Sequence, residues 1–151
     1  MAGEAISLLI KNKIIASSII FDPSLPLKTK SIYEDKEKAD GVRVLITRFF
    51  PRGVKKTHFD LWLRNASPEA SLLKKYKSEG MNWREFSKEF RKQMRILPES
   101  KKAIQELIEL LGREKDVTLL CYEKEGQNCH RYLVKALVES TIKRKSKKTQ
   151  T

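Results

Sequence analysis

The residue types best suited to chemistry gather in two short runs, Cys121-Tyr122-Glu123-Lys124 and Cys129-His130-Arg131. A carboxylate such as Glu123 can accept a proton, and an imidazole such as His130 can donate or accept one near neutral pH. A thiolate such as Cys129 can act as a nucleophile. These three side chains are therefore the candidate catalytic residues, although their spacing assigns no reaction.

The second run is expected to open a helix, with Asn128 as the N-cap and residues 129–131 as the first turn. The unpaired backbone N–H groups and the dipole at such a helix end favour anions and stabilise a thiolate. We therefore predict that Lys124, His130 and Arg131 contact an anionic ligand.

A purely structural role is the alternative for these side chains. Cys129 falls on the same helical face as Leu133, and free cysteines are common in protein cores. Cys121 alternates with Leu119 along a predicted strand, which also suits burial. A lone histidine such as His130 is as often a hydrogen-bonded core residue as a functional one.

A metal site is a further reading of the same residues. Cys121, Cys129 and His130 with Glu123 have suitable ligand types but lack the paired-cysteine spacing of a zinc site. The chain's two cysteines and two histidines are also too few for a four-ligand site built from these residues alone. We predict no cofactor and no metal site, and a divalent metal remains the alternative.

The segment of residues 48–56 carries four cations on a shaped turn, with the sequence RFFPRGVKK. Gly53 permits a positive φ there. Arg48 and Arg52 can hold a phosphate or carboxylate through two-pronged hydrogen bonds, and Lys56 can add a charge. The alternative is that the two phenylalanines are buried while the cations stay solvated.

Both segments are expected to follow buried strands. Residues 27–33 and 41–47 alternate like strands, and residues 117–122 are apolar on both faces, which favours a central strand of a parallel sheet. Ligands bind beyond the carboxyl ends of the strands in such sheets. Segments 48–56 and 123–131 are therefore expected to share one cleft.

The remaining pattern predicts helices between and after these strands. Their starts are marked by turn and cap residues, namely Ser67 before Pro68, Asn82 with Glu85 three residues on, and Pro98. Together these elements predict an α/β fold, in which a small, mostly parallel sheet carries helices on both faces in a single three-layer domain.

The length of 151 residues fits one domain, and 32 lysines and arginines against 19 acidic residues give a net charge of +13. We expect an N-terminal extension over 1–26, the domain over 27–142 and a disordered basic tail over 143–151. No segment reads as a membrane span or a secretory signal, and two cysteines suggest no disulfide framework. We therefore expect a cytoplasmic protein with no membrane partner, whose ligand is a phosphate-bearing metabolite or nucleotide.

Nucleic-acid binding is the alternative function. Arg84, Lys88, Arg91 and Arg95 are spaced four, three and four residues apart, so they form one row on a predicted helix. Such a row and the basic tail can bind a phosphate backbone. The plainer interpretation is an exposed face that is partly neutralised by neighbouring glutamates.

At the two chemical segments the chain resembles the YeaO-like branch of the DUF488 family, a family of domains of unknown function. Members typically carry a strand ending in Asp-Arg, then an aromatic residue, Pro-Arg-Gly and a downstream lysine. The matching residues here are Thr47-Arg48-Phe49-Phe50-Pro51-Arg52-Gly53 with Lys55 and Lys56, Trp62, Pro68, Trp83, Phe86, Val117-Thr118-Leu119-Leu120-Cys121, Glu123-Lys124 and Cys129-His130-Arg131.

This resemblance runs from about Leu27 to Val138 and implies a compact α/β domain of bacteria and archaea, but no established reaction. Two positions depart from the family pattern. Thr47 replaces the usual aspartate, which removes an acceptor or base, and Glu69 stands where a small hydroxylated residue is common. The resemblance therefore bears on the fold and the location of the site more than on the activity.

Overall fold

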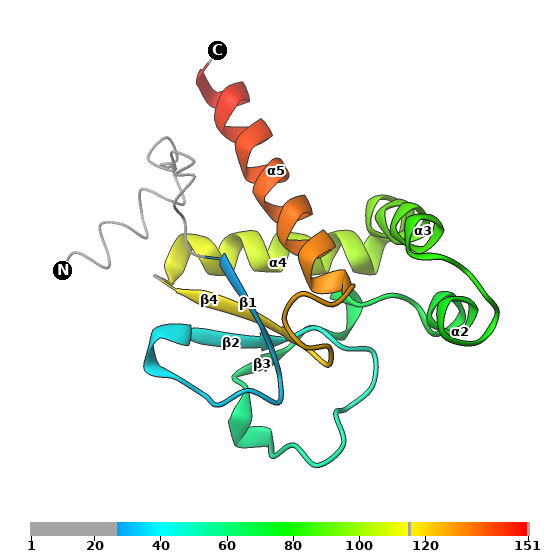
Figure 1. Cartoon of the computed structure of the whole chain (residues 1–151). Coiled ribbons are helices and arrows are strands. Elements are labelled where there is room, and N and C mark those ends of the chain that lie inside the picture. The colour runs from blue at the N-terminus through cyan, green and yellow to red at the C-terminus, as the bar shows by residue number, and fades with distance from the viewer. Residues whose placement is uncertain (1–26, 115, 151) are drawn as a thin grey trace.

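A parallel sheet of four strands lies at the centre of the computed structural model, which describes residues 27–114 and 116–150 (Figure 1). The strands run in the spatial order β1-β4-β2-β3 and all pair in parallel. Their bounds are β1 Leu27–Ser31, β2 Val42–Leu45, β3 Leu61–Trp62 and β4 Val117–Cys121. The predicted α/β class and parallel sheet are confirmed. The predicted extension over 1–26 lies outside the described residues.

The central strand is β4, as its unbroken apolar sequence predicts. All five of its residues are buried, and it pairs with β1 on one side and β2 on the other. Thr118 lies opposite both Lys28 and Arg43 in these two ladders. A strand buried on both faces needs no polar alternation, which explains its run of Val, Leu and Cys.

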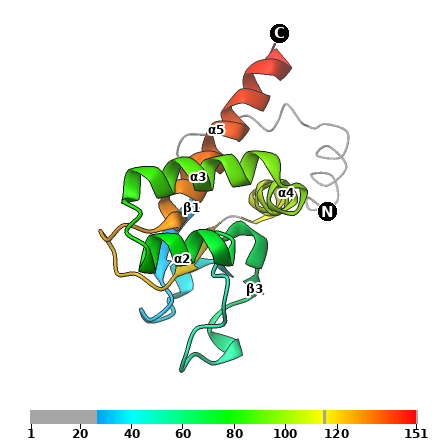
Figure 2. The same ribbon diagram turned by 90° about the vertical axis from the view of Figure 1, so that its right-hand side faces the viewer.

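Four α-helices of the described residues pack against one face of this sheet (Figures 1 and 2). Their apolar side chains join those of Val44, Ile46, Val117 and Leu119 in the larger core cluster. Figure 2 shows α2 and α3 running side by side, with α4 seen end-on. The bounds are α2 Ala70–Ser78, α3 Trp83–Ile96, α4 Pro98–Arg113 and α5 His130–Gln150.

The helix starts follow the sequence signals at α3 and α4, and α5 begins at His130, one residue later than the predicted Asn128 N-cap implies. Asn82 and Glu85 form the predicted capping box of α3, and Pro98 is the first residue of α4. For α2 the prediction was wrong by two residues, because Glu69 and not Ser67 is the N-cap. The Ser67 hydroxyl instead donates a hydrogen bond back to the carbonyl oxygen of Arg64, which ends the preceding 3-10 turn η3 (Arg64–Ala66).

The opposite face of the sheet is covered by loops and by two short 3-10 turns, η1 (Lys38–Asp40) and η2 (Lys56–His58). A smaller core of Ile32, Leu45 and Leu120 lies there. The connections that cross this face join β1 to β2 and β2 to β3, and each contains a 3-10 turn and no α-helix. The two outer layers are therefore unequal in thickness.

A buried charge network anchors the shorter layer. Arg43 is fully buried on β2, and its guanidinium donates to the carboxylate of Asp40 and, over 2.8 Å, to the carbonyl oxygen of His58. Lys30 of β1 approaches the same carboxylate at 3.1 Å. Gly41, with φ of 66°, turns the chain directly into β2, and a Cβ there would lie 2.1 Å from the carbonyl oxygen of Asp116.

In the segment for which the sequence predicts a disordered basic tail, α5 continues as a helix to Gln150. Helix propagation costs little once the first turns are anchored, and lysine, arginine and glutamine are good helix formers. Cations in the last turns also complement the negative end of the helix dipole. The run of lysine and arginine residues after Ile142 is therefore compatible with a helix.

Within residues 27–114 and 116–150, no helix is both long enough and apolar enough to cross a membrane.

Candidate functional site

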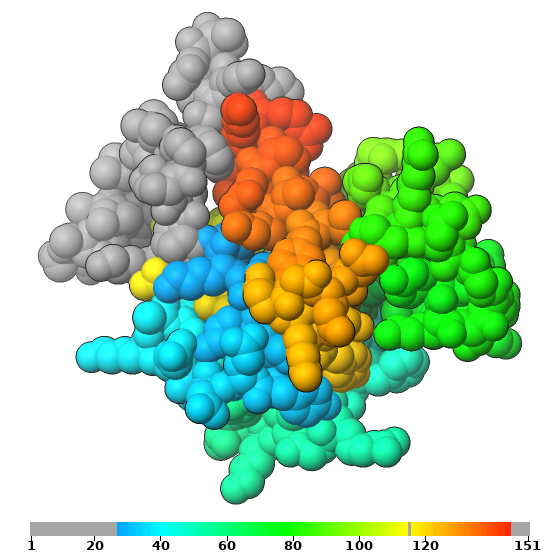
Figure 3. Space-filling model, in the orientation of Figure 1, coloured from blue at the N-terminus to red at the C-terminus, as the bar shows by residue number. Residues whose placement is uncertain are grey.

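A pocket of about 380 Å³ opens at the carboxyl ends of β2 and β4 and is closed on one side by α2. Both predicted segments line it. Its lining residues are Thr47, Arg48, Phe49, Pro68, Ala70, Leu73, Lys74, Lys77, Ser78, Cys121, Tyr122, Glu123 and His130. Figure 3 shows the loop after β4 (orange) lying between the blue N-terminal strand region and the green helices.

Direct hydrogen bonds hold the two segments together at this edge. The hydroxyl of Tyr122 donates to the carbonyl oxygen of Phe49, and the Nε2 of His130 bonds the carbonyl oxygen of Ile46. The parallel pairing of β2 with β4 aligns their carboxyl ends, which is why residues far apart in sequence meet here.

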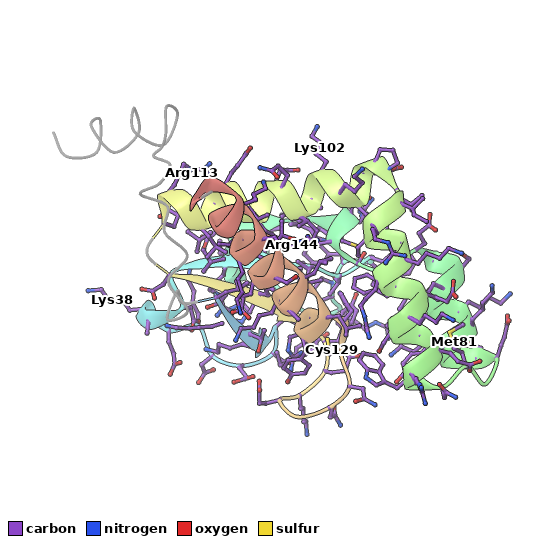
Figure 4. All side chains as sticks on the ribbon, turned by 90° about the horizontal axis from the view of Figure 1, so that it is seen from above. Lys38, Met81, Lys102, Arg113, Cys129 and Arg144 are labelled. Atoms are coloured by element: carbon purple, nitrogen blue, oxygen red, sulfur yellow. The ribbon has the colours of Figure 1, made fainter. Side chains whose placement is uncertain are left out.

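Two thiols and one imidazole meet beside the pocket, which Cys121 and His130 line and Cys129 does not. The Sγ atom of Cys121 lies 3.6 Å from Nδ1 of His130, and the Sγ atom of Cys129 lies 4.0 Å from the same nitrogen. All three residues are buried, with exposed fractions of 1%, 2% and 7%. Figure 4 shows Cys129 at the N-terminal end of α5, where the loop from β4 enters the helix.

The two thiols have unequal acidities. A hydrogen bond from the Cys121 thiol lowers the pKa of Cys129 to about 6, with further help from His130 and from the backbone N–H of Arg131. Burial raises the pKa of Cys121 well above its ordinary value. Cys129 is therefore the more acidic thiol of the pair, and Cys121 is the donor between them.

Glu123 lies at the rim of this cluster. Its Oε1 accepts a hydrogen bond of 3.4 Å from the Cys121 thiol, while Oε2 lies 3.4 Å from the ammonium of Lys77. Burial acts to raise the pKa of Glu123, but hydrogen bonds from the Cys129 thiol and the charge of Lys77 outweigh it and leave that pKa lowered. The carboxylate is therefore an acceptor at neutral pH.

The cations of the pocket come from both predicted and unpredicted positions. Arg48, as predicted, lines the pocket, and it also donates 3.0 Å bonds to the carbonyl oxygens of Pro68 and Ser67. Lys74 and Lys77 of α2 were missed by sequence reasoning. Their spacing of three residues on a lysine-rich helix does not distinguish them from solvated lysines.

Three predicted ligand contacts lie outside the pocket. Arg52, Lys56 and Lys124 are exposed and are not among the lining residues. Gly53 adopts the expected positive φ of 76°. The turn at Gly53 directs Arg52 and Lys56 away from the sheet edge at the ends of β2 and β4. These two residues lie instead in the loop layer that contains η2.

Arg131 has a structural role in place of the predicted ligand contact. It is fully buried, and its Nη1 donates a 2.7 Å hydrogen bond to the carbonyl oxygen of Glu123. Its Nη2 donates over 3.1 Å to the hydroxyl of Tyr132. The side chain thus pins the loop after β4 onto the start of α5.

The two departures from the family pattern, Thr47 and Glu69, both make hydrogen bonds near the pocket. Thr47 is buried, and its hydroxyl donates a 2.7 Å bond to the carbonyl oxygen of Phe49, while its own carbonyl accepts from Trp62. Glu69 is the N-cap of α2, and its backbone N–H donates over 2.9 Å to the side chain of Gln93. Thr47 therefore shapes the pocket wall and carries no ionisable group.

Two other hollows lie among the helices. One of about 630 Å³ lies between α2 and α3 and is lined by lysines and glutamates of mixed sign. The other, of about 420 Å³, lies between α3, α4 and α5, and its charged lining residues are all cations, namely Arg91, Arg95, Lys101 and Arg144. We call the second hollow the basic groove.

Comparison with known proteins places these features in a family context. The family model described as "DUF488-N3a: Active DUF488-N3 subclade" matches residues 27–142. The chain is 32% identical over 66 residues to the protein described as "Uncharacterized protein YeaO" of Escherichia coli, which covers 42% of this chain and 57% of that protein. Over 89 residues it is 27% identical to "Uncharacterized protein Rv3073c" of Mycobacterium tuberculosis, covering 58% of this chain and 72% of that protein. No solved structure matches the chain significantly.

Proposed function

Since this chain belongs to the YeaO-like branch of the DUF488 family, we propose from the site that its fold builds that it binds a small anionic ligand in the pocket between β2, β4 and α2. A phosphate-bearing metabolite or a nucleotide has the chemistry that the pocket offers. The observation that carries the proposal is the convergence of Arg48, Lys74 and Lys77 on one concave site at the carboxyl ends of parallel strands.

The charge balance of the pocket favours an anion. Three cationic side chains line it against the single carboxylate of Glu123. The net charge of +13 on the whole chain raises the local concentration of anions before any contact forms. An ammonium or guanidinium bonded to a phosphate oxygen contributes about 1.5–3 kcal/mol, so two or three such contacts support useful affinity.

The size of the pocket limits the ligand. Its volume of about 380 Å³ lies near the lower end of the range typical of ligand sites, roughly 300–1,000 Å³. A single nucleotide or a small phosphorylated metabolite fits this range better than a dinucleotide. Cys121 and His130 place a thiol and an imidazole beside such a ligand. The proposal therefore includes an enzyme that acts on this ligand, and enzymatic activity should be assayed.

Binding to the intact chain tests this proposal. We expect thermal-shift and calorimetric titrations with inorganic phosphate, nucleoside monophosphates and sugar phosphates to identify a ligand that raises the melting temperature. The double variant Lys74→Gln with Lys77→Gln should weaken that ligand at least tenfold.

Lys75→Gln is the matched control, since Lys75 lies between these two lysines on α2 but lines the hollow toward α3. We expect it to bind the ligand like the unmodified chain. Equal affinities for the double variant and the control, or no binding by any of these anions, would refute the proposal.

The basic groove supports nucleic-acid binding as the second candidate function. Arg91 and Arg95 of the predicted cationic row meet Arg144 of α5 across this groove, and no carboxylate is among its lining residues. Figure 4 shows Arg144 partway along α5.

A salt titration separates the two candidates. If the groove binds nucleic acid, Arg91→Gln with Arg95→Gln should lower the slope of log affinity against log salt by roughly one unit for each lost phosphate contact. The Lys74 and Lys77 variant should then bind the same oligonucleotide normally. The opposite pattern assigns anion binding to the pocket.

A further inference from the structure

We propose that Cys121, Cys129 and His130 bind one divalent metal ion that prefers thiolate ligands, with Zn²⁺ the best match, beside the pocket. The sequence spacing did not predict such a site, because Cys121 lies on β4 and the other two ligands lie at the start of α5. The site does not depend on the proposed anion ligand.

The first argument is the separation of the ligand atoms. Both sulfurs and a ring nitrogen lie within 4.8 Å of one another, and the distances from Nδ1 of His130 are 3.6 Å to Cys121 Sγ and 4.0 Å to Cys129 Sγ. Zinc–sulfur bonds of about 2.3 Å and zinc–nitrogen bonds of about 2.0 Å put tetrahedral ligands about 3.5–3.8 Å apart. Coordination thus requires the ligand atoms to move closer by up to about 1 Å.

The second argument is the orientation of the imidazole. Nε2 of His130 bonds the carbonyl oxygen of Ile46, which can only accept, so this nitrogen carries the proton. In the neutral ring the lone pair then lies on Nδ1, which is within 4.0 Å of both sulfurs. Cys121 Sγ also lies 3.8 Å from Nε2, so coordination requires this thiol or the ring to turn. A backbone carbonyl that holds the remote N–H of a histidine is the usual support of a metal-binding imidazole.

The third argument is the surroundings of the cluster. The three ligands are at least nine-tenths buried, and the ring of Phe90 contacts His130 edge-on at 5.7 Å between centroids. The backbone N–H of Arg131 donates to Cys129 Sγ over 3.5 Å, as second-layer donors do around metal-bound thiolates. An apolar shell of this kind excludes competing water from the bonds.

The ligand set selects the class of metal. Two thiolates and one imidazole suit Zn²⁺ and exclude a preference for Mg²⁺ or Ca²⁺, which take oxygen ligands. Cys121 and His130 both line the pocket, so the ion has an entry path and its fourth coordination position faces the pocket.

Cobalt binding to the full chain tests the proposal. Protein that has been reduced and stripped with a chelator should take up one Co²⁺ per chain, with thiolate-to-cobalt charge-transfer absorption and the intense visible bands of a tetrahedral site. Added Zn²⁺ should displace the cobalt and protect both cysteines from alkylation. Cys121→Ser, Cys129→Ser and His130→Gln should each weaken binding at least tenfold.

His58→Gln is the matched control, because His58 is the only other histidine of the chain and its ring contacts the carbonyl oxygen of Glu34 on the far side of the sheet. It should bind cobalt like the unmodified chain. If a ligand variant does not fold, zinc protection of the two thiols in the unmodified chain still decides the matter. Reduced protein that binds no cobalt, or binds it without thiolate bands, overturns the proposal, as does a cysteine pair that only forms a disulfide.

Discussion

At the scale of single residues, burial separates cations of the same type into different roles. Arg131 and Arg52 both lie in segments that the sequence marks as anion-binding, yet Arg131 is fully buried and Arg52 is exposed. The guanidinium of Arg131 satisfies the carbonyl oxygen of Glu123 inside the protein, and its Nε has no hydrogen-bond partner among the described residues. Such a side chain supports the loop it touches and is not free to hold a ligand.

Arg131→Ala should therefore reduce the stability of the fold. Its removal leaves a buried carbonyl without its donor and a cavity beside Tyr132, which together cost about 3 kcal/mol of unfolding free energy. Urea denaturation followed by tryptophan fluorescence measures this loss. Arg52→Ala, an exposed change in the other predicted segment, is the control and should leave the midpoint unchanged. Equal midpoints for both variants would contradict the structural role of Arg131.

Exposed residues of the same type also differ in role, as the lysines of α2 show. Lys74, Lys75 and Lys77 are neighbours on α2 and are all exposed, but only the first and third line the pocket at the sheet edge. The difference depends on the rotation of α2 about its axis, which is set by the packing of Leu73 and Tyr76 against the core. No property of an isolated lysine reports this rotation.

At the scale of elements, β2 carries the fully buried cation Arg43, which needs a charged partner inside the protein. Arg43 of β2 points into the face opposite the α-helices, where the carboxylate of Asp40 of η1 neutralises it and also pairs with Lys30 of β1. Burial acts to raise the pKa of Asp40, but hydrogen bonds from the backbone N–H of Glu37, from Lys30 and from Arg43 outweigh it and leave that pKa lowered.

This lowered pKa predicts an acid-dependent loss of stability. A carboxyl whose pKa is lower in the folded than in the unfolded chain contributes stability above its unfolded pKa, and that contribution disappears as the pH falls through the folded value. The unfolding free energy should therefore decrease from pH 5 to pH 2. Asp40→Asn should be less stable at pH 7 by about 3 kcal/mol, because it leaves Arg43 unneutralised.

Asp40→Asn should also flatten the acid dependence, which urea denaturation at several pH values measures. Asp35→Asn is the control, since Asp35 is exposed and its backbone oxygen, not its carboxylate, contacts Lys30. An acid dependence that survives Asp40→Asn unchanged would show that other carboxylates are responsible.

The length of α5 is a second property of an element that can be measured. Ile142 is the last buried residue among those described on α5, and the next three side chains, of residues 143–145, are exposed. A chain that ends at Ile142 should unfold at the same urea midpoint but lose far-ultraviolet helical signal, since residues 143–150 are helical in the full chain. A truncated chain with an unchanged helical signal would restore the interpretation as a disordered tail.

At the scale of the whole molecule, the segment 27–142 holds every strand of the described sheet and the core that covers it. Its first residue, Leu27, is buried in the larger core cluster. The family model matches the same range.

A chain that begins at Leu27 should therefore fold with nearly unchanged stability. Its melting temperature and its solubility on expression measure this directly. Residues 1–26 lie outside the described part of the chain. Comparing the shortened chain with the full chain therefore tests what these residues contribute to stability. A loss of soluble protein would show that this segment packs onto the domain or onto a partner.

The sequence alone was sufficient for β1, β2 and β4, for the starts of α3 and α4, and for the edge of the sheet that carries the site. The apolar run of β4, the capping pair Asn82 and Glu85 and the proline at the start of α4 are local signals, because burial on two faces and the hydrogen bonds of a helix end are decided by residues close in sequence. The resemblance at residues 48–53 and 129–131 identified the family.

Only the tertiary structure decided which side chains meet. Cys121 and Cys129 both lie within 4.0 Å of the same nitrogen of His130, and Arg131, next in sequence, points into the protein. These differences arise because the pairing of β2 with β4 and the packing of α5 set the direction of each side chain, and neither is recorded in the local pattern of residue types. The chemistry at the sheet edge is therefore a property of the fold, since groups on separate elements must approach within a few ångströms before they can act together.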